Sequence, residues 1–406
     1  MMIPYGYKQT EVGVIPEDWE LLLLGKTAKV YRGGSPRPIQ SYITNSSNGV
    51  NWIKIGDVRE NDKYIYSTQE KIRPDGISMS REVHIGDFIL SNSMSFGRPY
   101  ILRTNGCIHD GWLTIQEYGQ AFSTEYLYYL LSSKIIYKQY IGMAAGSSVK
   151  NLNKDKVSSL MVICPPLPEQ RRIAEALSDV DGMISSLEKL VAKYKSIKTA
   201  CLQQMFPQNG ETVPRMRLPG FTGAWEQRKF EEIAVRSSVI CSDDTLPRVE
   251  YEDIVSGTGR LNKDIYAKQS IKSGIAFHQG DVLYGKLRPY LQNWLLPTFD
   301  GLAVGDFWVL QPQNADSSFL YRLIQSRQFD EVANQSTGTK MPRADWKLVS
   351  KTVFSIPSNI SEQAAIGTYF TALDSLITLH QRKLEKVQKI KQGMMQQLLT
   401  GKIRLV

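Results

Sequence analysis

Two stretches of the chain carry the same narrow apolar stripe. From Ile173 to Met205, and again from Ile366 to Leu398, apolar residues recur in alternating steps of four and three positions. A stripe of this kind, sustained over about five heptads, is typical of a coiled-coil helix that needs a partner helix. The stripe residues, called the helix seam below, are Ile173, Leu177, Val180, Ile184, Leu187 and Val191 in the first copy and Ile366, Phe370, Leu373, Ile377, Leu384 and Val387 in the second.

The two stretches are copies of one another. Residues 169–206 and 362–399 align without a gap at an offset of 193 positions, and ten of the 38 pairs are identical. Ordinary composition would give roughly one match in sixteen. We therefore expect an internal duplication with a pseudo-twofold relation, in which each long helix is the antiparallel partner of the other. The alternative is two independent amphipathic helices, each docked on its own domain or on another protein.

Three polar residues interrupt the seam. Lys198 and Lys391 occupy the same position in the two copies. They either fix the register of the helices or extend their ammonium groups to solvent near the ends of the rod, and we favour the second. His380 faces no obvious acid and is expected to fill the seam without binding a ligand.

The segments outside the long helices predict two related α+β domains. Each half has short β-rich runs separated by turns, followed by a helical stretch, expected over residues 124–140 in the first half and 317–332 in the second. We expect domains at residues 1–164 and 218–355, long helical segments at 165–207 and 356–406, and a polar linker at 208–217. The predicted fold class is thus α+β, with two globular domains separated by two long helices that form an antiparallel coiled coil.

Composition narrows the functional classes. The 406 residues have a formal charge of +9 and a mean hydropathy of −0.27. No apolar run approaches the roughly 18 residues of a membrane span, so we expect no membrane contact. The four cysteines show no paired spacing, which favours the reducing cytoplasm. The excess of Lys and Arg points to a polyanionic partner such as nucleic acid, although it also serves solubility.

The motifs give little support to catalysis. The Gly25-Lys26-Thr27 run lacks the glycine that a phosphate-binding loop needs five residues earlier. The run from Cys164 to Leu167 resembles the Asp/Asn-Pro-Pro-aromatic loop of amino-methyltransferases, but it lacks both the polar group and the aromatic ring. The scattered histidines and cysteines predict no metal site. We therefore favour a non-catalytic chain.

Several motifs, taken in order, resemble the specificity subunits of type I restriction-modification enzymes. The resemblance covers nearly the whole chain and includes the duplicated plan. Its motifs are 13-GVIPEDWE-20, 33-GGSP-36, 52-WIKIGD-57, 86-GDFIL-90 with 97-GRP-99, 165-PPLPEQ-170 and 218-LPGF-221. The second half lacks counterparts of the GGSP and WIKIGD motifs, so its domain belongs to a different subgroup.

This resemblance implies a DNA-binding subunit of a restriction system. Two target-recognition domains would each read one half of a split, asymmetric site in double-stranded DNA, and the two helices would hold them apart. Two methyltransferase subunits and two restriction subunits would assemble on this scaffold. S-adenosylmethionine, ATP and Mg²⁺ would be bound by those partners, and this chain would need no cofactor.

Basic and polar residues beside the turns are the candidates for DNA contact. Lys and Arg neutralise phosphates, while Arg, Lys and Asn can also read base edges. Arg98 and Arg288 recur in both halves, which suits a phosphate or framework role. For each candidate a solvated charge or a turn is an equally simple explanation. The candidates are Arg37, Lys54, Asn92, Ser95 and Arg98 in the first domain and Lys286, Arg288, Tyr290, Lys340 and Arg343 in the second.

Two other classes of function remain open. One is a coiled-coil scaffold protein without sequence-selective DNA binding. The other is a self-sufficient nuclease or methyltransferase, which the missing catalytic motifs disfavour. The target sequence, its spacer length and the residues that read bases are not encoded in any pattern that we can interpret.

Overall fold

The computed structural model describes residues 3–59, 62–92, 97–144, 152–208, 210–267, 271–335 and 341–406. The chain forms two compact units, Met1–Ser186 with Leu384–Val406, and Leu187–Lys383. Both unit boundaries fall inside the long helices α5 (Leu167–Gln204) and α10 (Ile360–Leu398), so each unit contains part of each helix. The two long helices predicted from the apolar stripe are present. The repeated stretches 169–206 and 362–399 match α5 and α10 within two residues, whereas the wider helical segments expected at 165–207 and 356–406 extend beyond them, by eight residues at the C-terminal end of the second.

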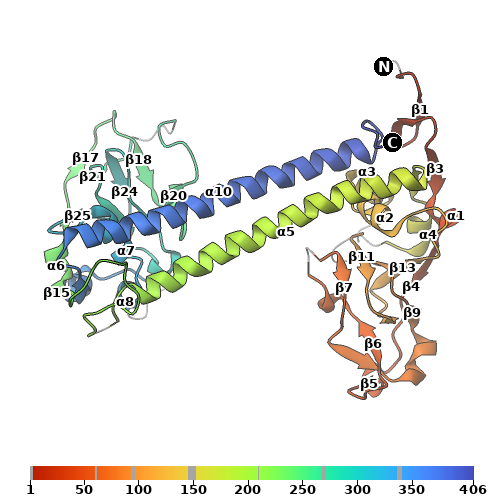
Figure 1. Ribbon diagram of the computed structural model, residues 1–406, viewed down its shortest axis with the longest axis horizontal. Helices are drawn as coiled ribbons and strands as arrows, with labels where there is room; N and C mark the ends of the chain where they lie inside the picture. Colours follow the sequence, from red (N-terminus) through yellow and green to blue (C-terminus); the bar gives the residue numbers. More distant parts are fainter. Residues whose placement is uncertain are drawn as a thin grey trace. The chain divides into compact units, whose positions relative to one another are not determined.

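The first unit contains two five-stranded sheets (Figure 1). One has the order β4 (Lys29–Arg32), β13 (Trp112–Gln116), β10 (Phe88–Ser91), β11 (Pro99–Leu102) and β7 (Tyr64–Ile65). The other has the order β5 (Ile43–Thr44), β8 (Glu70–Ile72), β6 (Val50–Ile53), β12 (Gly106–Ile108) and β9 (Arg81–Val83). Two short pairs, β1 (Tyr7–Thr10) with β2 (Gly13–Pro16) and β3 (Glu20–Leu23) with β14 (Met161–Cys164), and α1 (Leu24–Thr27) complete its β-rich part.

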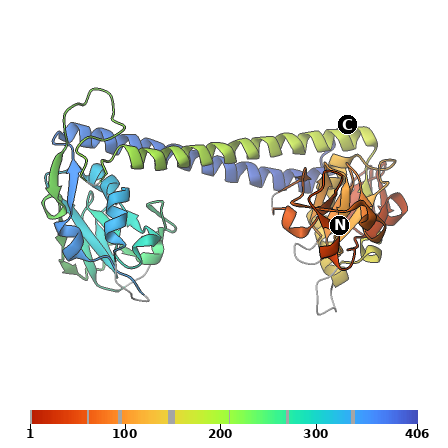
Figure 2. The ribbon, with the colours of Figure 1, turned by 90° about the horizontal axis from the view of Figure 1, so that it is seen from below.

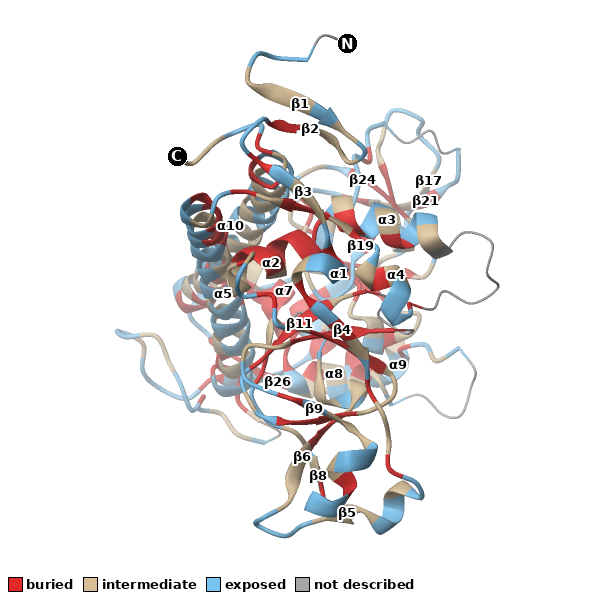
Figure 3. Cartoon of the chain, turned by 90° about the vertical axis from the view of Figure 1, so that its right-hand side faces the viewer, coloured by how far each residue is buried: buried red, intermediate tan, exposed pale blue. Residues whose placement is uncertain are grey.

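The central strand β10 is buried on both faces because its side chains alternate between two cores. Phe88 and Leu90 join the core that includes α2 (Thr124–Leu131) and the start of α5, whereas Ile89 joins the core formed with β6, β9 and β12. Successive side chains of a strand point to opposite faces, so one apolar run serves both cores. Buried residues accordingly fill α2 and the neighbouring strands in Figure 3.

The second unit repeats this plan with shorter sheets. Strand β16 (Ala234–Ser237) pairs with β25 (Phe307–Pro312), which pairs with β22 (Val282–Gly285), as β4, β13 and β10 do in the first unit. The remaining strands are β23 (Trp294–Leu295), β17 (Ile240–Cys241), β21 (Gly274–Phe277), β24 (Gly301–Val304), β18 (Arg248–Glu250), β19 (Ile254–Val255), β20 (Arg260–Leu261), β15 (Glu226–Lys229) and β26 (Val353–Ile356).

In each half, the predicted helical stretch consists of two separate helices. Residues 124–140 fall in α2 and α3 (Lys134–Ala144), and residues 317–332 fall in α7 (Ser317–Leu323) and α8 (Arg327–Ala333). A serine begins each second helix: Ser133 Oγ accepts a hydrogen bond from Ile136 N, and Ser326 Oγ accepts one from Phe329 N. Serine competes for backbone hydrogen bonds in this way and therefore favours a helix start over a helix interior. Shorter helices are α4 (Lys154–Ser158), α6 (Phe230–Ile233) and α9 (Trp346–Lys351).

Within each unit, α5 and α10 lie against each other and run in opposite directions (Figures 1 and 2). Asp181 binds Lys391 at 2.6 Å in the first unit, and Asp374 binds Lys198 at 2.7 Å in the second. These four residues form two of the ten identical pairs of the duplication, so the same interhelical contact is made twice. Neither lysine extends to solvent as we favoured, because each finds a carboxylate on the facing helix. His380 stacks on Tyr194 with ring centroids 5.5 Å apart, inside the seam as expected.

The seam residues are the least exposed positions along the middle of both helices. Ile173, Leu177, Val180, Val191, Ile366, Phe370, Leu373 and Ile377 are buried, whereas Ile184, Leu187, Leu384 and Val387 are half-buried. Two parallel sets of contacts fix where each helix begins. Trp19 Nε1 donates to Glu169, and Trp225 Nε1 donates to Glu362. The duplication therefore extends from the helices into the strands before them.

Candidate nucleic-acid interface

In the first unit, polar and basic side chains gather around Asp110, in the turn between β12 and β13. Ser35 Oγ donates to one carboxylate oxygen at 2.9 Å, His109 Nε2 lies 3.0 Å from the same oxygen, and Arg37 Nη2 lies 3.5 Å from the other. Asn92 Nδ2 donates to the backbone oxygen of Asp110 at 3.2 Å. We call these five residues the Asp110 cluster. Two of the predicted contacts, Arg37 and Asn92, therefore lie in one place although they are 55 positions apart.

The surroundings of Asp110 favour the ionised form of its carboxylate. Burial raises the pKa of the Asp110 carboxyl, but the Ser35 hydrogen bond and the nearby His109 and Arg37 outweigh burial and hold the pKa below its ordinary value. The carboxylate is thus ionised at neutral pH and anchors one end of the Arg37 guanidinium. The Arg37 side chain remains 81% exposed, so its other N–H donors face solvent. A guanidinium held in this manner is suited to a phosphate or a base edge.

The other candidates of the first unit lie in different environments. Asn92 is only 6% exposed, so its side chain supports the Asp110 turn. Lys54 follows β6 and forms an ion pair with Glu70 on β8. Arg98 is half-buried in the turn before β11. Ser95 lies outside the residues that the structure describes.

In the second unit, Asp306 occupies the corresponding place, in the turn between β24 and β25. Arg343 Nη2 lies 3.1 Å from one carboxylate oxygen and Lys286 Nζ lies 3.5 Å from the other. Burial raises the pKa of the Asp306 carboxyl, but Arg343 and Lys286 outweigh burial and lower it overall. One carboxylate therefore holds two cations, and we call these three residues the Asp306 cluster. Two further predicted contacts, Lys286 and Arg343, are thereby brought together.

The two clusters occupy equivalent positions of the duplicated fold. Asn92 follows β10 and Lys286 follows β22, and these strands are the same element of the repeat. The backbone oxygen of Asn92 accepts a hydrogen bond from Leu152 N at 3.0 Å, and that of Lys286 accepts one from Ala344 N at 2.9 Å. The same backbone geometry therefore presents a different set of side chains in each unit.

The remaining candidates of the second unit lie on one short loop. Arg288 has a positive φ of 49° and Gln292 one of 55°, and they flank the single turn Pro289–Leu291. Such backbone is uncommon for residues other than glycine. Two backbone hydrogen bonds hold the loop, from Arg288 N to Pro342 O and from Gly257 N to Gln292 O. Tyr290 is 57% exposed on this loop, and Lys340 lies outside the described residues.

Sequence reasoning missed the acidic centres of both clusters. Asp110 and Asp306 each lie beside a glycine, Gly111 and Gly305, and at sequence level they resemble ordinary turn residues. Only the neighbouring His109 hinted at a polar site, and the sequence did not show which cations would reach these carboxylates. Arg32, another basic residue beside the Gly33-Gly34 turn, also reaches this place, because its Nε donates to Asp110 O at 3.4 Å.

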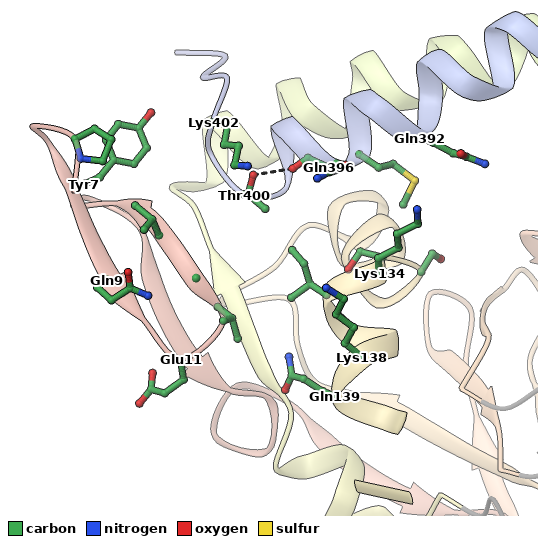
Figure 4. A pocket seen from close by; sticks show the side chains of 18 of the residues that line it. Tyr7, Gln9, Glu11, Lys134, Lys138, Gln139, Gln392, Gln396, Thr400 and Lys402 are labelled. Carbon is green, nitrogen blue, oxygen red and sulfur yellow. Dashed lines mark hydrogen bonds between the residues drawn. The ribbon is translucent and has the colours of Figure 1, made fainter. Parts of the chain in front are cut away.

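A groove of about 1230 Å³ lies elsewhere in the first unit (Figure 4). The β1–β2 hairpin, α3 and the last turns of α10 form its walls, with Lys134 and Lys138 on α3 and Lys402 after α10. Tyr7, at the hairpin, donates to the backbone oxygen of Gly401 at 2.9 Å. None of the predicted DNA contacts lines this groove.

Two features are absent from the described residues. These residues contain no group of three or more His, Cys, Asp or Glu side chains placed to hold a metal ion. No helix among them combines the length and the apolar character that crossing a bilayer requires.

Comparison with known proteins agrees with the duplicated plan. A family model described as the type I restriction modification DNA specificity domain matches residues 16–198 and 242–389. The type I restriction enzyme MjaVIII specificity subunit of Methanocaldococcus jannaschii is 22% identical, over 96% of this chain and 94% of its own length. The EcoDI specificity subunit of Escherichia coli is also 22% identical, over 96% of this chain and 90% of its own length.

Solved structures share the fold. A chain from a study of complex assembly and conformational transition of a type I R-M system superposes with a TM-score of 0.61 at 16% identity, covering 96% of this chain and 99% of that chain. The S subunit of a type I restriction-modification system from M. genitalium gives a TM-score of 0.58 at 13% identity, covering 98% of both chains.

Proposed function

The chain belongs to the family of type I restriction-modification DNA specificity subunits, and we propose that it reads a bipartite, asymmetric DNA target through its two units. Each unit would read one half of the target. In this proposal the paired helices α5 and α10, as an antiparallel coiled coil, set the spacing between the half-sites.

One observation carries this proposal. The Asp110 and Asp306 clusters lie at equivalent positions of the duplicated fold, yet they present different side chains. Equivalent positions would let the two units approach DNA in the same manner, whereas different side chains would read different sequences. A scaffold protein without DNA binding would have no need of exposed cations at both positions.

We further propose that the chain is non-catalytic and acts in the cytoplasm with partner subunits. Two methyltransferase subunits and two restriction subunits would supply the chemistry, with S-adenosylmethionine, ATP and Mg²⁺ bound in those partners. Family membership and the four free cysteines support this assignment.

The test is a genome-wide map of methylated adenines in the native host, with the gene intact, deleted or replaced by variants. Deletion should remove one bipartite motif that has a fixed spacer. Arg37→Gln should relax the preference for bases in one half of the motif, and Arg343→Gln in the other half. Arg215→Gln is the matched control, because among the described residues this exposed arginine pairs only with Glu211 on its own segment, so the variant should leave the map unchanged.

Two results would contradict the proposal. If the map stays the same after deletion while the partner methyltransferase is expressed, the scaffold function is favoured. If both variants alter the same half of the motif, the assignment of one half-site to each unit is wrong.

A further inference from the structure

A shallow hollow in the second unit lies beside the Asp306 cluster. Its volume is about 400 Å³. Two tryptophans, Trp308 and Trp346, form its apolar wall, and four cations line it: Arg236, Lys286, Arg343 and Lys347. We call it the Arg236 hollow. Arg236 comes from β16, whereas Trp346 and Lys347 come from α9, 110 positions later. Because of this separation, the sequence does not show that the three residues form one site.

Aromatic contacts hold the Arg236 guanidinium in place. Its central carbon lies 5.0 Å from the centre of the Trp346 ring. That ring is itself fixed by edge contacts with Trp308 at 5.2 Å and with Phe230 at 6.0 Å. A guanidinium over an aromatic ring is attracted to the ring face, and this contact consumes none of the N–H donors of Arg236.

The hollow carries an excess of positive charge. No carboxylate of the described chain lies within ion-pair distance of Arg236 or Lys347. Asp306 binds Lys286 and Arg343, and Asp345 accepts a hydrogen bond from the backbone N of Lys347 at 2.8 Å. Four cations thus face two carboxylates, so the hollow can accept an anion.

We propose that the Arg236 hollow binds one phosphate group of the DNA backbone, held by Arg236 and Lys347. This inference rests on the proposed function, because it assumes that the second unit lies on DNA. A fixed guanidinium and a neighbouring ammonium match the oxygens of a phosphate, and the indole wall limits screening by solvent. Such a contact adds affinity and positions the reading loops without specifying bases.

The described residues of the first unit form no counterpart of this hollow. Arg236 on β16 pairs with Leu310 on β25. The equivalent position of the first unit lies on β4, which pairs with β13, and is occupied by Val30, which is buried in the core. At the start of α4, the helix equivalent to α9, the first two residues are Lys154 and Asp155 in place of Trp346 and Lys347. The hollow is therefore a property of the second half and not of the shared fold.

The experiment measures binding of the full chain to duplex DNA as a function of salt. One duplex carries the motif found by methylation mapping, and in a second duplex the half-site read by the second unit is scrambled. The variants are Arg236→Gln, Lys347→Gln and the double variant. Lys189→Gln is the control, because Lys189 is an equally exposed cation of the same unit on α5. All variants have exposed side chains, and circular dichroism checks their fold.

The proposal predicts a loss of affinity that is independent of sequence. Each single variant should reduce the slope of log affinity against log salt by about one and weaken binding roughly tenfold at low salt. The preference for the motif over the scrambled duplex should stay the same within about twofold, because phosphate contacts carry no base information.

The outcomes separate this inference from the proposed function. If the wild-type chain prefers the motif but both variants behave like Lys189→Gln, the phosphate site is wrong and the proposed function stands. If the variants lose the preference for the motif, Arg236 and Lys347 read bases and the inference is overturned. If the wild-type chain shows no preference, the proposed function fails and the inference fails with it.

Discussion

Asp374 is the residue whose neutralisation should most weaken the contact between α5 and α10. Its carboxylate accepts hydrogen bonds from Lys198 Nζ at 2.7 Å and from Arg322 Nη1 at 2.8 Å. The two cations are nearly buried, with exposed fractions of 15% for Lys198 and 4% for Arg322. Asp374→Asn removes the only carboxylate that pairs with either of them in the described chain, and leaves two adjacent cations in the seam.

The expected cost follows from burial. Breaking a buried ion pair costs about 3–5 kcal/mol, because the remaining charge is left without compensation. Asp374 is 30% exposed, so we expect the lower end of this range, about 3 kcal/mol. For a unit of this size that loss lowers the melting temperature by roughly 6–12 °C.

The duplication supplies a matched control. Asp181 is the equivalent residue of the first unit, where its partners are Lys391 and the neutral hydroxyl of Tyr129. Lys391 is 25% exposed, and Lys63 reaches the Asp181 carboxylate only through the Tyr129 hydroxyl, so Asp181→Asn should cost only about 1 kcal/mol. Adding Lys198→Gln to Asp374→Asn removes one of the unpaired cations and should restore about half of the lost stability.

Thermal unfolding followed by circular dichroism gives the overall loss, and hydrogen exchange of peptides from α5 and α10 gives its location. The reasoning is refuted if Asp374→Asn is no more destabilising than Asp181→Asn. It is also refuted if adding Lys198→Gln to Asp374→Asn causes a further loss of stability, because repulsion between the cations would then not be the cause.

Three further predictions concern single contacts. Burial raises the pKa of the Glu169 carboxyl, but the hydrogen bonds from Arg404 and Trp19 outweigh burial and hold the pKa below its ordinary 4.5, so the stability that they contribute is present above pH 4.5 and lost as the pH falls further. Arg404→Gln should cost about 3 kcal/mol at neutral pH and flatten the acid limb of a stability-against-pH curve. Gly33→Ala places a Cβ against the backbone oxygen of His109, closer than the backbone allows without a shift, and should cost about 2–3 kcal/mol in urea unfolding. Gly56→Ala, with open space around it, should not. Gln170→Leu removes hydrogen bonds that tie the start of α5 to the preceding strand and to α2. The variant should lose about 1–3 kcal/mol of stability, and its melting temperature should fall by several degrees.

The sequence predicted the elements that depend on local periodicity. The alternating steps from Ile173 and Ile366 identified both long helices, because a helix buries one stripe of its surface and that stripe is visible in any sequence. The repeat at a fixed offset also identified the two related domains. The helical stretch predicted at 124–140 is helical except for a break between α2 and α3, which the sequence did not reveal and where Ser133 competes for a backbone hydrogen bond.

The sites depended on contacts between distant segments. Arg37 and Asn92 were predicted one by one, but nothing in the sequence placed both at Asp110, or Lys286 and Arg343 at Asp306. The prediction that these residues contact DNA stays a prediction.

The sequence by itself determined that this protein has two related halves and two long helices, because duplication and apolar period are properties of residue order. Tertiary structure alone decided that Lys198 and Lys391 pair with carboxylates of the facing helix, and that Arg236 stacks on Trp346. The physical reason is that charge pairing and stacking act over a few ångströms in space, and chain folding sets these distances independently of separation along the sequence.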